Sequence, residues 1–477
     1  MTEEQFFIDG RWTANGATLA IEDPSTGEQI GTLAAGGPAD IDAAVLAADK
    51  AFHGAWGKTT AADRGRVLAR MSKLVEAQAE DLALLEARDV GKPLKQARAD
   101  ALALARYLEF YAGAADKLHG ETLPYLAGYT VYTLREPHGV TGHIVPWNYP
   151  MQIIGRSVVG ALAAGNATIV KPAEEASLTA LAFARIAAEA GLPAGALNVV
   201  TGLGEEAGAA LAGHPGVHHV SFTGSTAVGA LVQAAAGKNA VPVTLELGGK
   251  SPQIVFADAD LQRALPFLVN AGIQNAGQTC SASSRLLVEE KIYDSLLENL
   301  SARYRALKVG AALDDLDVGP LISAAQKSRV EAYVERGRKD GLQVAAEGSI
   351  ASNAPAGGHF SRPTLFAGVA PDHLLAQDEI FGPVQVVIPF RSEEEAVQIA
   401  NGTQYGLVAG VWTGDGGRAM RLSRDVRAGQ VFINNYGAGG GAELPFGGVG
   451  RSGHGREKGF EALYGFTRLK TVAAYHG

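Results

Sequence analysis

The sequence predicts an α/β protein with two domains, each built on a largely parallel sheet, and a small additional β element. Short apolar runs alternate with helical stretches from Gly139 to Leu247, and a second block of this kind follows over residues 248–455. Such alternation is typical of βαβ units. The chain has 477 residues, which is more than one ordinary hydrophobic core accommodates, so at least two domains are expected.

The N-terminal region begins with a hairpin and continues with helices. The stretch "QFFIDGRWT" predicts two short strands joined by an Asp9-Gly10 turn. Residues 38–56 place apolar side chains at helical spacing. Residues 62–91 predict one or two helices that end at Gly91, because glycine is the usual helix stop.

Each α/β block has strands that the apolar runs identify. In the first block these runs are GHIVP, ATIVKP, LNVVTG, HVSFTG and VTLELGG. The intervening helical stretches are 150–164, 176–190, 204–212 and 225–236. In the second block the strands are QIVF, VQVVIPF, YGLVAGVWT and GQVFINN, and IYDSLLENLSARYRALKVG is a helix.

Composition excludes several classes of function. The net charge of −9 makes electrostatic binding to nucleic acid or to an anionic membrane improbable. The single cysteine excludes an intrachain disulfide and fits a reducing compartment. The N-terminus lacks the basic and apolar regions of a signal peptide, and the run 158–170 is too short to span a bilayer. These features predict a cytoplasmic protein with neither a nucleic-acid nor a membrane partner.

The single cysteine, Cys280, lies in "NAGQTCSASSR", where small polar residues follow it. A thiolate is a strong nucleophile when its surroundings are polar and partly open. A helix that begins near Cys280 would stabilise the thiolate through its dipole. The alternative is a buried, inert thiol.

Two further residues have side chains suited to catalysis. Glu246 ends an apolar run in "VTLELGGKSP", so burial should raise its pKa and suit it to act as a general base. The alternative is a glutamate paired with a lysine or an arginine. Asn148, in the turn "VPWNYP", has a side-chain amide that can donate to a developing oxyanion, although asparagine is also a common turn residue.

Two strand ends indicate a nucleotide site. Lys171 ends the strand in "IVKPAEEAS" and Glu174 follows it, at the edge where nucleotide-binding sheets meet their ligand. Gly224 and Ser225 in "VSFTGSTAVG" stand at a strand-to-helix junction, where backbone amides can hold a phosphate. The stretch does not match G-x-G-x-x-G.

Taken together and in order, "PWNYP", "KPAE", "FTGST", "ELGGK", "GQTCSA", "EIFGPV" and "PFGGVGRSG" resemble the NAD(P)-dependent aldehyde dehydrogenase superfamily. The resemblance runs from about residue 6 to the C-terminus. It implies an aldehyde dehydrogenase-like fold of two Rossmann-like α/β domains and a small β oligomerisation element. The NAD-binding domain would comprise 1–117 and 138–247, the catalytic domain 248–455, and the oligomerisation element 118–137 and 466–477.

The resemblance also implies a mechanism. The Cys280 thiolate would attack the aldehyde to form a thiohemiacetal, whose oxyanion the Asn148 amide and the Cys280 backbone would hold. Loss of hydride to the nicotinamide would leave a thioester, which a water activated by Glu246 would hydrolyse to the carboxylic acid. The implied cofactor is NAD and no metal is expected. The implied cofactor-binding residues are Trp147, Lys171, Glu174, Gly224, Ser225, Leu247, Glu379 and Phe381.

Glu174 favours NAD over NADP, because a carboxylate beside the ribose accepts from its hydroxyls and repels a 2′-phosphate. For the substrate, Tyr149 and Arg156 are expected in the aldehyde tunnel. Arginine at position 156 resembles both semialdehyde dehydrogenases, where it holds a carboxylate, and dehydrogenases of aromatic aldehydes; it could also pair with an acid of the protein. Gln274 stands where a second carboxylate-binding arginine would be, so aromatic or medium-chain apolar aldehydes are favoured.

The two strands at 129–135 and 466–475 resemble the oligomerisation element of the family, and exposed strands seldom stay unpaired. A homodimer or homotetramer is therefore expected. Rival interpretations are a CoA-acylating aldehyde dehydrogenase, an acyl-phosphate reductase, a cysteine esterase and a non-catalytic structural or binding protein on the same scaffold. Glu246 argues against the CoA-acylating enzyme, which does not need a water-activating glutamate.

Overall fold

The N-terminal hairpin forms as the sequence predicts, because its turn residues adopt the left-handed conformation that a two-residue turn requires. In the computed structural model, which describes residues 2–437 and 441–477, Asp9 has φ 49° and Gly10 has φ 75°. The strands β2 (Phe6–Ile8) and β3 (Arg11–Thr13) pair antiparallel on either side of them. This hairpin forms one edge of a large sheet.

That first sheet has a parallel centre, as the alternating pattern predicts. Its order is β22-β12-β11-β8-β9-β10-β2-β3, and the pairs from β12 through β10 are parallel. The remaining bounds are β8 (Val140–Val145), β9 (Ala167–Pro172), β10 (Leu197–Val199), β11 (His219–Thr223), β12 (Val243–Glu246) and β22 (Gly453–His454). The edge strand β22 comes from the range expected for the catalytic domain and pairs with β12.

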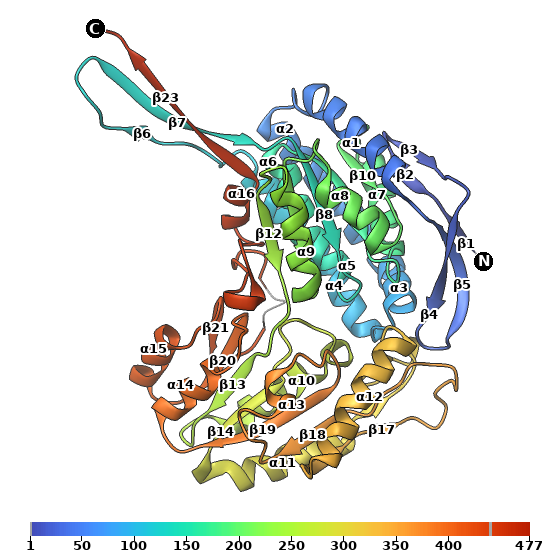
Figure 1. The fold of residues 1–477 in the computed structure, drawn as a ribbon, viewed down its shortest axis with the longest axis vertical. Helices are drawn as coiled ribbons and strands as arrows, with labels where there is room; N and C mark the ends of the chain where they lie inside the picture. The colour runs from blue at the N-terminus through green and yellow to red at the C-terminus, as the bar shows by residue number, and fades with distance from the viewer. Residues whose placement is uncertain (1, 438–440) are drawn as a thin grey trace.

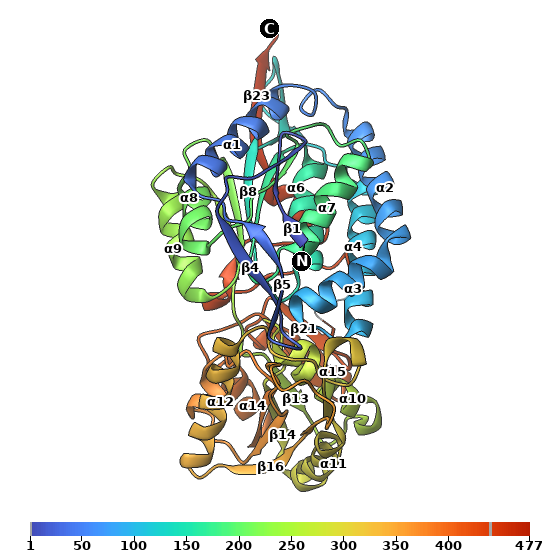
Figure 2. The same ribbon diagram turned by 90° about the vertical axis from the view of Figure 1, so that its right-hand side faces the viewer.

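Helices cover both faces of this sheet. Figure 2 shows α1, α8 and α9 on one side and α2, α4 and α7 on the other. Their bounds are α1 (Pro38–His53), α2 (Ala61–Ala77), α3 (Ala79–Val90), α4 (Leu94–Ala114), α5 (Pro150–Ile153), α6 (Val159–Ala164), α7 (Leu178–Glu189), α8 (Ala209–Gly213) and α9 (Thr226–Gly237). The stretch 62–91 forms two helices, and Gly91, with φ 80°, ends the second as expected. Two of the helical stretches contain a π-helical turn, at Ile154–Val158 (η1) and Gly204–Gly208 (η2).

The second domain lies below the first in Figure 1 and has its own sheet, in the order β16-β18-β19-β14-β13-β20-β21. All neighbours are parallel except β16 and β18. The bounds are β13 (Pro252–Val255), β14 (Arg285–Glu289), β16 (Gln343–Glu347), β18 (Thr364–Ala367), β19 (Val384–Phe390), β20 (Val408–Trp412) and β21 (Gln430–Ile433).

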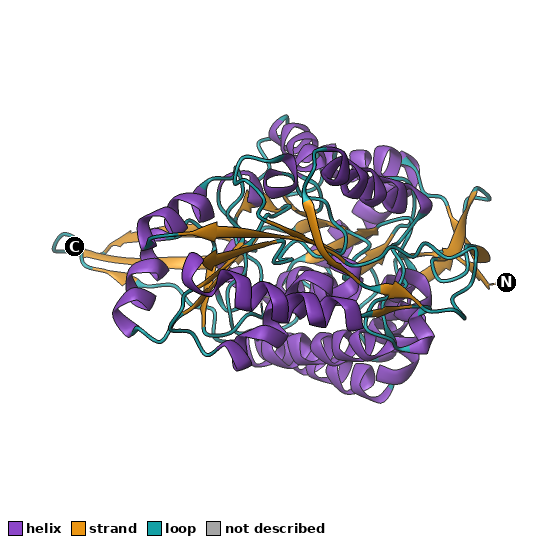
Figure 3. Ribbon diagram, turned by 90° about the horizontal axis from the view of Figure 1, so that it is seen from below, coloured by secondary structure: helices purple, strands orange, loops and turns teal. Residues whose placement is uncertain are grey.

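Helices flank this sheet as well, and Figure 3 shows helices outside the strands on both sides of the molecule. They are α10 (Leu261–Ile273), α11 (Tyr293–Ala306), α12 (Ala324–Lys339), α13 (Leu374–Gln377), α14 (Glu393–Asn401) and α15 (Gly416–Asp425). The helix α16 (Glu461–Gly465) returns to the first domain, where Ala462 and Leu463 join its core. Short 3-10 turns are η3 (Gln274–Gly277), η4 (Glu290–Ile292), η5 (Ala312–Asp314) and η6 (Gly450–Ser452).

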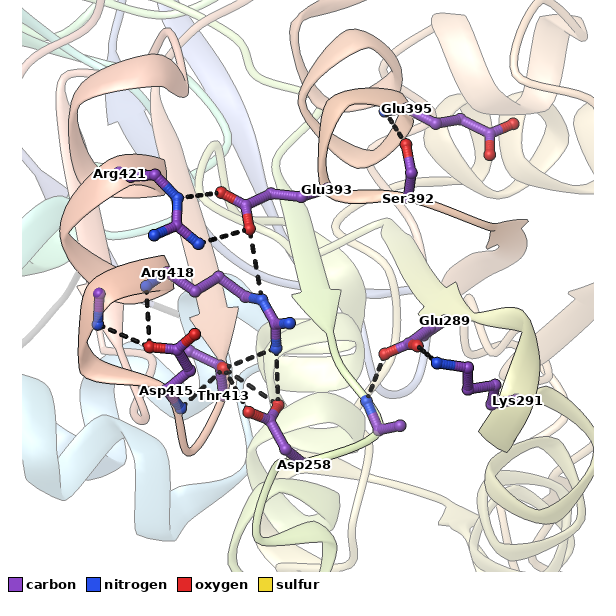
Figure 4. Close-up of polar contacts among 12 residues, drawn as sticks. Asp258, Glu289, Lys291, Ser392, Glu393, Glu395, Thr413, Asp415, Arg418 and Arg421 are labelled. Atoms are coloured by element: carbon purple, nitrogen blue, oxygen red, sulfur yellow. Dashed lines mark hydrogen bonds and ion pairs between the residues drawn. The ribbon is translucent and has the colours of Figure 1, made fainter.

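A charged network joins α14 to α15 at the surface of the second domain (Figure 4). Arg421 holds Glu393 through two hydrogen bonds of 2.7 and 2.9 Å. Arg418 lies 3.4 Å from the same carboxylate and donates to Asp258 at 3.0 Å. Its side chains are partly exposed, and none of these four residues lines the cavity described below.

Three small sheets complete the fold. The longest consists of β6 (Thr122–Leu123), β7 (Tyr129–Pro137) and β23 (Thr467–Tyr475), which project from the first domain in Figure 1. The others are β1 (Thr2–Glu4) with β4 (Thr18–Asp23) and β5 (Glu28–Ala34), and β15 (Lys308–Val309) with β17 (Ser349–Ile350). Within the residues described, no helix has the length and apolar character needed to cross a membrane.

Candidate active site

The functional residues meet where parallel strands of the first sheet end. Strands β8, β11 and β12 run in the same direction, so Asn148, Ser225 and Glu246 reach one edge. A cavity of about 350 Å³ opens there, and the loop of Cys280 from the second domain lies across it. The predicted residues that line it are Trp147, Asn148, Tyr149, Arg156, Gly224, Ser225, Glu246, Gln274, Cys280, Glu379 and Phe381.

Cys280 lies in a turn between η3 and β14, so the stabilisation that a helix beginning beside it would provide does not apply. The loop before it is shaped by three successive left-handed residues, Asn275, Ala276 and Gly277, with φ of 49°, 54° and 73°. Glycine is required at 277, because a Cβ there would lie 2.1 Å from the carbonyl oxygen of Gly382. Backbone geometry, and not a helix, therefore presents the sulfur.

Asn148 is held against this loop by reciprocal hydrogen bonds. Its Nδ2 donates to the carbonyl of Gln278 at 3.0 Å, and Asn275 Nδ2 donates to the carbonyl of Asn148 at 3.0 Å. The amide of Asn148 has a second N–H, which leaves one donor for a ligand beside Cys280. The side chain of Asn148 is therefore fixed against the Cys280 loop, in addition to the place of this residue in a turn.

The Cys280 thiol is held in its neutral form. Burial raises the pKa of Cys280 to about 12, against the opposing effect of Arg156, and the acidic neighbours Glu379 and Glu246 raise it further. Near neutral pH the sulfur carries its proton. Reaction at this sulfur consequently requires that a proton be removed.

Glu246 is almost fully buried, and neither carboxylate oxygen has a hydrogen-bond partner within the described ranges. Burial raises the pKa of Glu246 well above its ordinary value; Glu457 adds to the rise, while Arg156 and Arg456 oppose it. The raised pKa expected from the sequence is thus found. A carboxylate of this kind is a stronger base than an exposed one.

The two glycines after Glu246 allow two functional groups to approach the strand end. A Cβ on Gly248 would lie 2.2 Å from Glu379 Oε2, and one on Gly249 would lie 2.4 Å from the carbonyl oxygen of Cys280. The backbone N–H of Gly249 donates to Glu379 Oε1 at 2.9 Å. Burial raises the pKa of Glu379 to about 7. Phe381 follows with φ 59° and packs edge-on against Trp147, with ring centroids 5.3 Å apart.

Arg156 lies in the π-helical turn η1 and pairs with an acid of the protein. Its Nε is 2.5 Å from Glu457 Oε2, and both side chains are buried. Ser221 Oγ donates to the other oxygen of Glu457 at 2.8 Å. The guanidinium also lies over the ring of Phe446, 4.6 Å from its centroid. Sequence reasoning left open that Arg156 pairs with an acid, and this is the arrangement observed.

Of the remaining predicted residues, Lys171, Glu174 and Leu247 are not among those that line the cavity, whereas Ser225 is. Lys171 Nζ donates to Glu174 Oε2 at 2.8 Å beyond the end of β9. Ser225 caps α9 by accepting from the N–H of Val228 at 3.3 Å. Leu247 is buried, and its N–H donates to the carbonyl of Ser452 at 3.1 Å.

Sequence reasoning missed three residues at the site. Phe446 lies near the end of the range expected for the catalytic domain, Glu457 follows that range, and Gln152 is on α5, four residues after Asn148. The stretch "PFGGVGRSG" contains Phe446 and was noted for its resemblance alone. Glu457 had no local signal, since its partner Arg156 is remote in the sequence. In the part of the chain that the structure describes, no cluster of three or more His, Cys, Asp or Glu could hold a metal ion.

Comparison with known proteins gives consistent results. The family model described as "Aldehyde dehydrogenase family" matches residues 12–472. The mitochondrial aldehyde dehydrogenase family 2 member B4 of Arabidopsis thaliana is 44% identical over 478 residues, covering 99% of this chain and 88% of the relative. A crystal structure from Burkholderia cenocepacia, described as an aldehyde dehydrogenase, has a TM-score of 0.99 at 64% identity, covering 99% of this chain and 100% of that one. The NAD+ complex of an aldehyde dehydrogenase from Bacillus cereus has a TM-score of 0.97 at 40% identity, covering 100% and 97%.

Proposed function

The chain belongs to the aldehyde dehydrogenase family, and we propose that it oxidises an aldehyde to a carboxylic acid with NAD as the hydride acceptor. The observation that carries the proposal is the joint placement of Cys280, Asn148 and Glu246 around one cavity. A nucleophile, an oxyanion donor and a base are the three groups that this chemistry requires.

In the proposed mechanism, Cys280 gives its proton to a water in the cavity, and the resulting thiolate attacks the carbonyl carbon of the aldehyde. The developing oxyanion is held by the second N–H of Asn148 and by the backbone N–H of Cys280. Collapse of the thiohemiacetal releases hydride and leaves a thioester on Cys280. Glu246 then takes a proton from a water, and the resulting hydroxide hydrolyses the thioester. The unpartnered oxygens of Glu246 are available for that water.

The residues of the site fit NAD. Gly224 and Ser225 open α9 at the cavity and offer backbone N–H groups for the pyrophosphate. Lys171 and Glu174 would contact the adenosine ribose, and Glu379 would contact the nicotinamide ribose. Trp147 and Phe381 supply apolar walls of the cavity, and Leu247, directly after Glu246, would lie close to the bound cofactor. When bound, the nicotinamide supplies the acceptor for the hydride.

NAD is favoured over NADP, because Glu174 would accept from ribose hydroxyls and repel a 2′-phosphate. The Bacillus cereus relative, whose solved complex contains NAD+, supports the same choice. Specificity constants for the two cofactors, measured with one aldehyde, test it. A higher value with NADP would contradict the preference.

For the substrate we propose aromatic or medium-chain apolar aldehydes. Arg156 is paired with Glu457, so its charge is already balanced, and Gln274, which also lines the cavity, is neutral. Ile153 and Phe446 add apolar surface to the cavity. The alternative is a semialdehyde, whose carboxylate would compete with Glu457 for Arg156.

The test measures NADH formation with benzaldehyde, a long aliphatic aldehyde and succinic semialdehyde. We expect activity that Cys280→Ser abolishes, with benzaldehyde or the aliphatic aldehyde preferred. Unchanged melting temperature and NAD binding of Cys280→Ser would show that folding is intact. Bound NAD without NADH from any aldehyde would favour the non-catalytic alternative. Unchanged preference in Arg156→Ala would exclude a selectivity role for Arg156.

We also propose that the protein is a homodimer or a homotetramer that assembles through the projecting sheet. Strand β7 pairs with β23 along its whole length, and Tyr129, Tyr132, Leu134 and Leu469 remain exposed on this sheet. Such a surface on a projecting element favours burial against another subunit. Light scattering at micromolar concentration would test this, and a monomer would refute it.

A further inference from the structure

A buried group of charges lies directly behind the wall of the cavity. Lys92, in the connection between α3 and α4, donates to Glu86 Oε1 at 2.8 Å and also forms an ion pair with Asp100 on α4. All three side chains are at most 3% exposed. The proposed mechanism uses none of them.

Two contacts connect this cluster to the cavity. Gln152 Nε2 donates to Asp100 Oδ1 at 2.5 Å, and Lys92 Nζ lies 3.8 Å from the centroid of the Tyr149 ring. Both Gln152 and Tyr149 line the cavity. The Lys92 ammonium is therefore surrounded by the side chains of Glu86, Asp100 and Tyr149. It reaches the wall of the cavity directly at Tyr149 and, through Asp100, at Gln152.

The charges of the cluster can be balanced. Burial raises the pKa of Glu86 to about 8, so at neutral pH Glu86 is mostly protonated. The Lys92 ammonium is then balanced by Asp100 alone. Replacing buried ion pairs by apolar side chains is often neutral or stabilising, so stability alone gives a weak reason for such a cluster. A buried ion pair can instead serve to fix the positions of the groups around it.

Resting on the proposed aldehyde oxidation, we propose that Lys92 and Asp100 are positioning residues, which hold Tyr149 and Gln152 and thereby set the shape of the aldehyde tunnel. An aromatic aldehyde has more surface to bury in the cavity than a small aldehyde, so it should depend more on contact with this wall. The cluster should therefore govern selectivity between large and small aldehydes. It should have little effect on the binding of NAD.

The experiment compares Lys92→Met with wild-type enzyme, using benzaldehyde and acetaldehyde. A desolvated cation–π contact is lost, so we expect the KM for benzaldehyde to rise about tenfold. The KM and kcat for acetaldehyde and the KM for NAD should change by less than about twofold. Arg98→Met is the matched control, because Arg98 is on α4, the helix of Asp100, and pairs with an exposed acid, Glu80, at 2.7 Å. It should leave all constants unchanged.

Equal losses with both aldehydes, or no change in either, would overturn the inference. If Lys92→Met does not fold, Asp100→Asn, which is nearly isosteric, takes its place with the same expectations. A crystal structure of the variant gives a second readout that needs no turnover. The inference requires that Tyr149 or Gln152 leaves its wild-type position, and unchanged positions would contradict it. Wild-type enzyme that oxidises no aldehyde would instead refute the proposed function, and the crystal structure would still decide the positioning role.

Discussion

Arg156→Met should destabilise the protein strongly, because it leaves the buried carboxylate of Glu457 without its positively charged partner. Glu457 is fully buried, and Arg156 is 8% exposed. Without the guanidinium, the Glu457 carboxylate retains one hydrogen bond, from Ser221. Removal of one partner of a buried ion pair typically costs about 3–5 kcal/mol. We expect a loss of this size in the free energy of unfolding.

The double variant Arg156→Met/Glu457→Gln separates the cost of the stranded charge from that of lost packing. With both charges removed, the loss should fall to about 1–2 kcal/mol or disappear, because a buried ion pair and a neutral pair of similar volume are often close in stability. The coupling between the two positions should therefore exceed about 1 kcal/mol, well within the range of direct contacts.

The assay is urea unfolding followed by tryptophan fluorescence, at one protein concentration because subunit association adds to apparent stability. Glu457→Gln alone is the third member of the cycle. A loss below about 1 kcal/mol for Arg156→Met would refute the reasoning. Equal losses in the single and double variants would also refute it, because packing alone would then account for the effect.

Three further predictions concern protonation and surface charge. Because the pKa of Cys280 is about 12, alkylation of cofactor-free protein by iodoacetamide should accelerate about tenfold per pH unit from pH 7 to 10; a plateau below pH 9 would contradict this. The pKa of Glu246 is raised by folding, so wild-type protein should lose stability as pH rises through that value, and Glu246→Gln should not. The melting temperature of Glu246→Gln relative to that of wild type should therefore be higher at pH 9 than at pH 5. An equal difference at the two pH values would exclude the effect. Glu393→Gln removes a partly exposed ion pair with Arg421 and should cost less than about 1 kcal/mol, with a smaller difference in 1 M salt; a urea-unfolding loss above about 2 kcal/mol would assign the network a larger role.

Much of the fold follows from local signals in the sequence. The Asp9-Gly10 turn, the helix stop at Gly91 and the parallel centre of the first sheet each depend on short stretches, and the structure contains all three. The resemblance to aldehyde dehydrogenases is confirmed by the family match, and the fold is confirmed by TM-scores of 0.96–0.99. The domain ranges and the roles assigned to site residues stay predictions.

The sequence was less informative where distant segments meet. Arg156 and Glu457 form one ion pair from opposite parts of the chain, so spacing could not reveal it. Strand β14 follows the Cys280 loop closely and was not predicted, although it lies inside the second sheet. The conformation of the Cys280 loop was also not predicted: three left-handed residues turn the chain before Cys280, and the cysteine itself lies in a turn. These features depend on tertiary contacts, which override local preference.

The same burial that shapes the cavity also sets its resting charge. Burial raises the pKa of Cys280, Glu246 and Glu379, and the nearby cation Arg156 is already balanced by Glu457. In the protein by itself, burial therefore favours the neutral form of all three groups. The thiolate is the reactive form of a cysteine, so the same burial lowers the reactivity of the thiol. A positive charge that enters the cavity would act in the opposite direction on all three groups at once, because it favours the charged form of each.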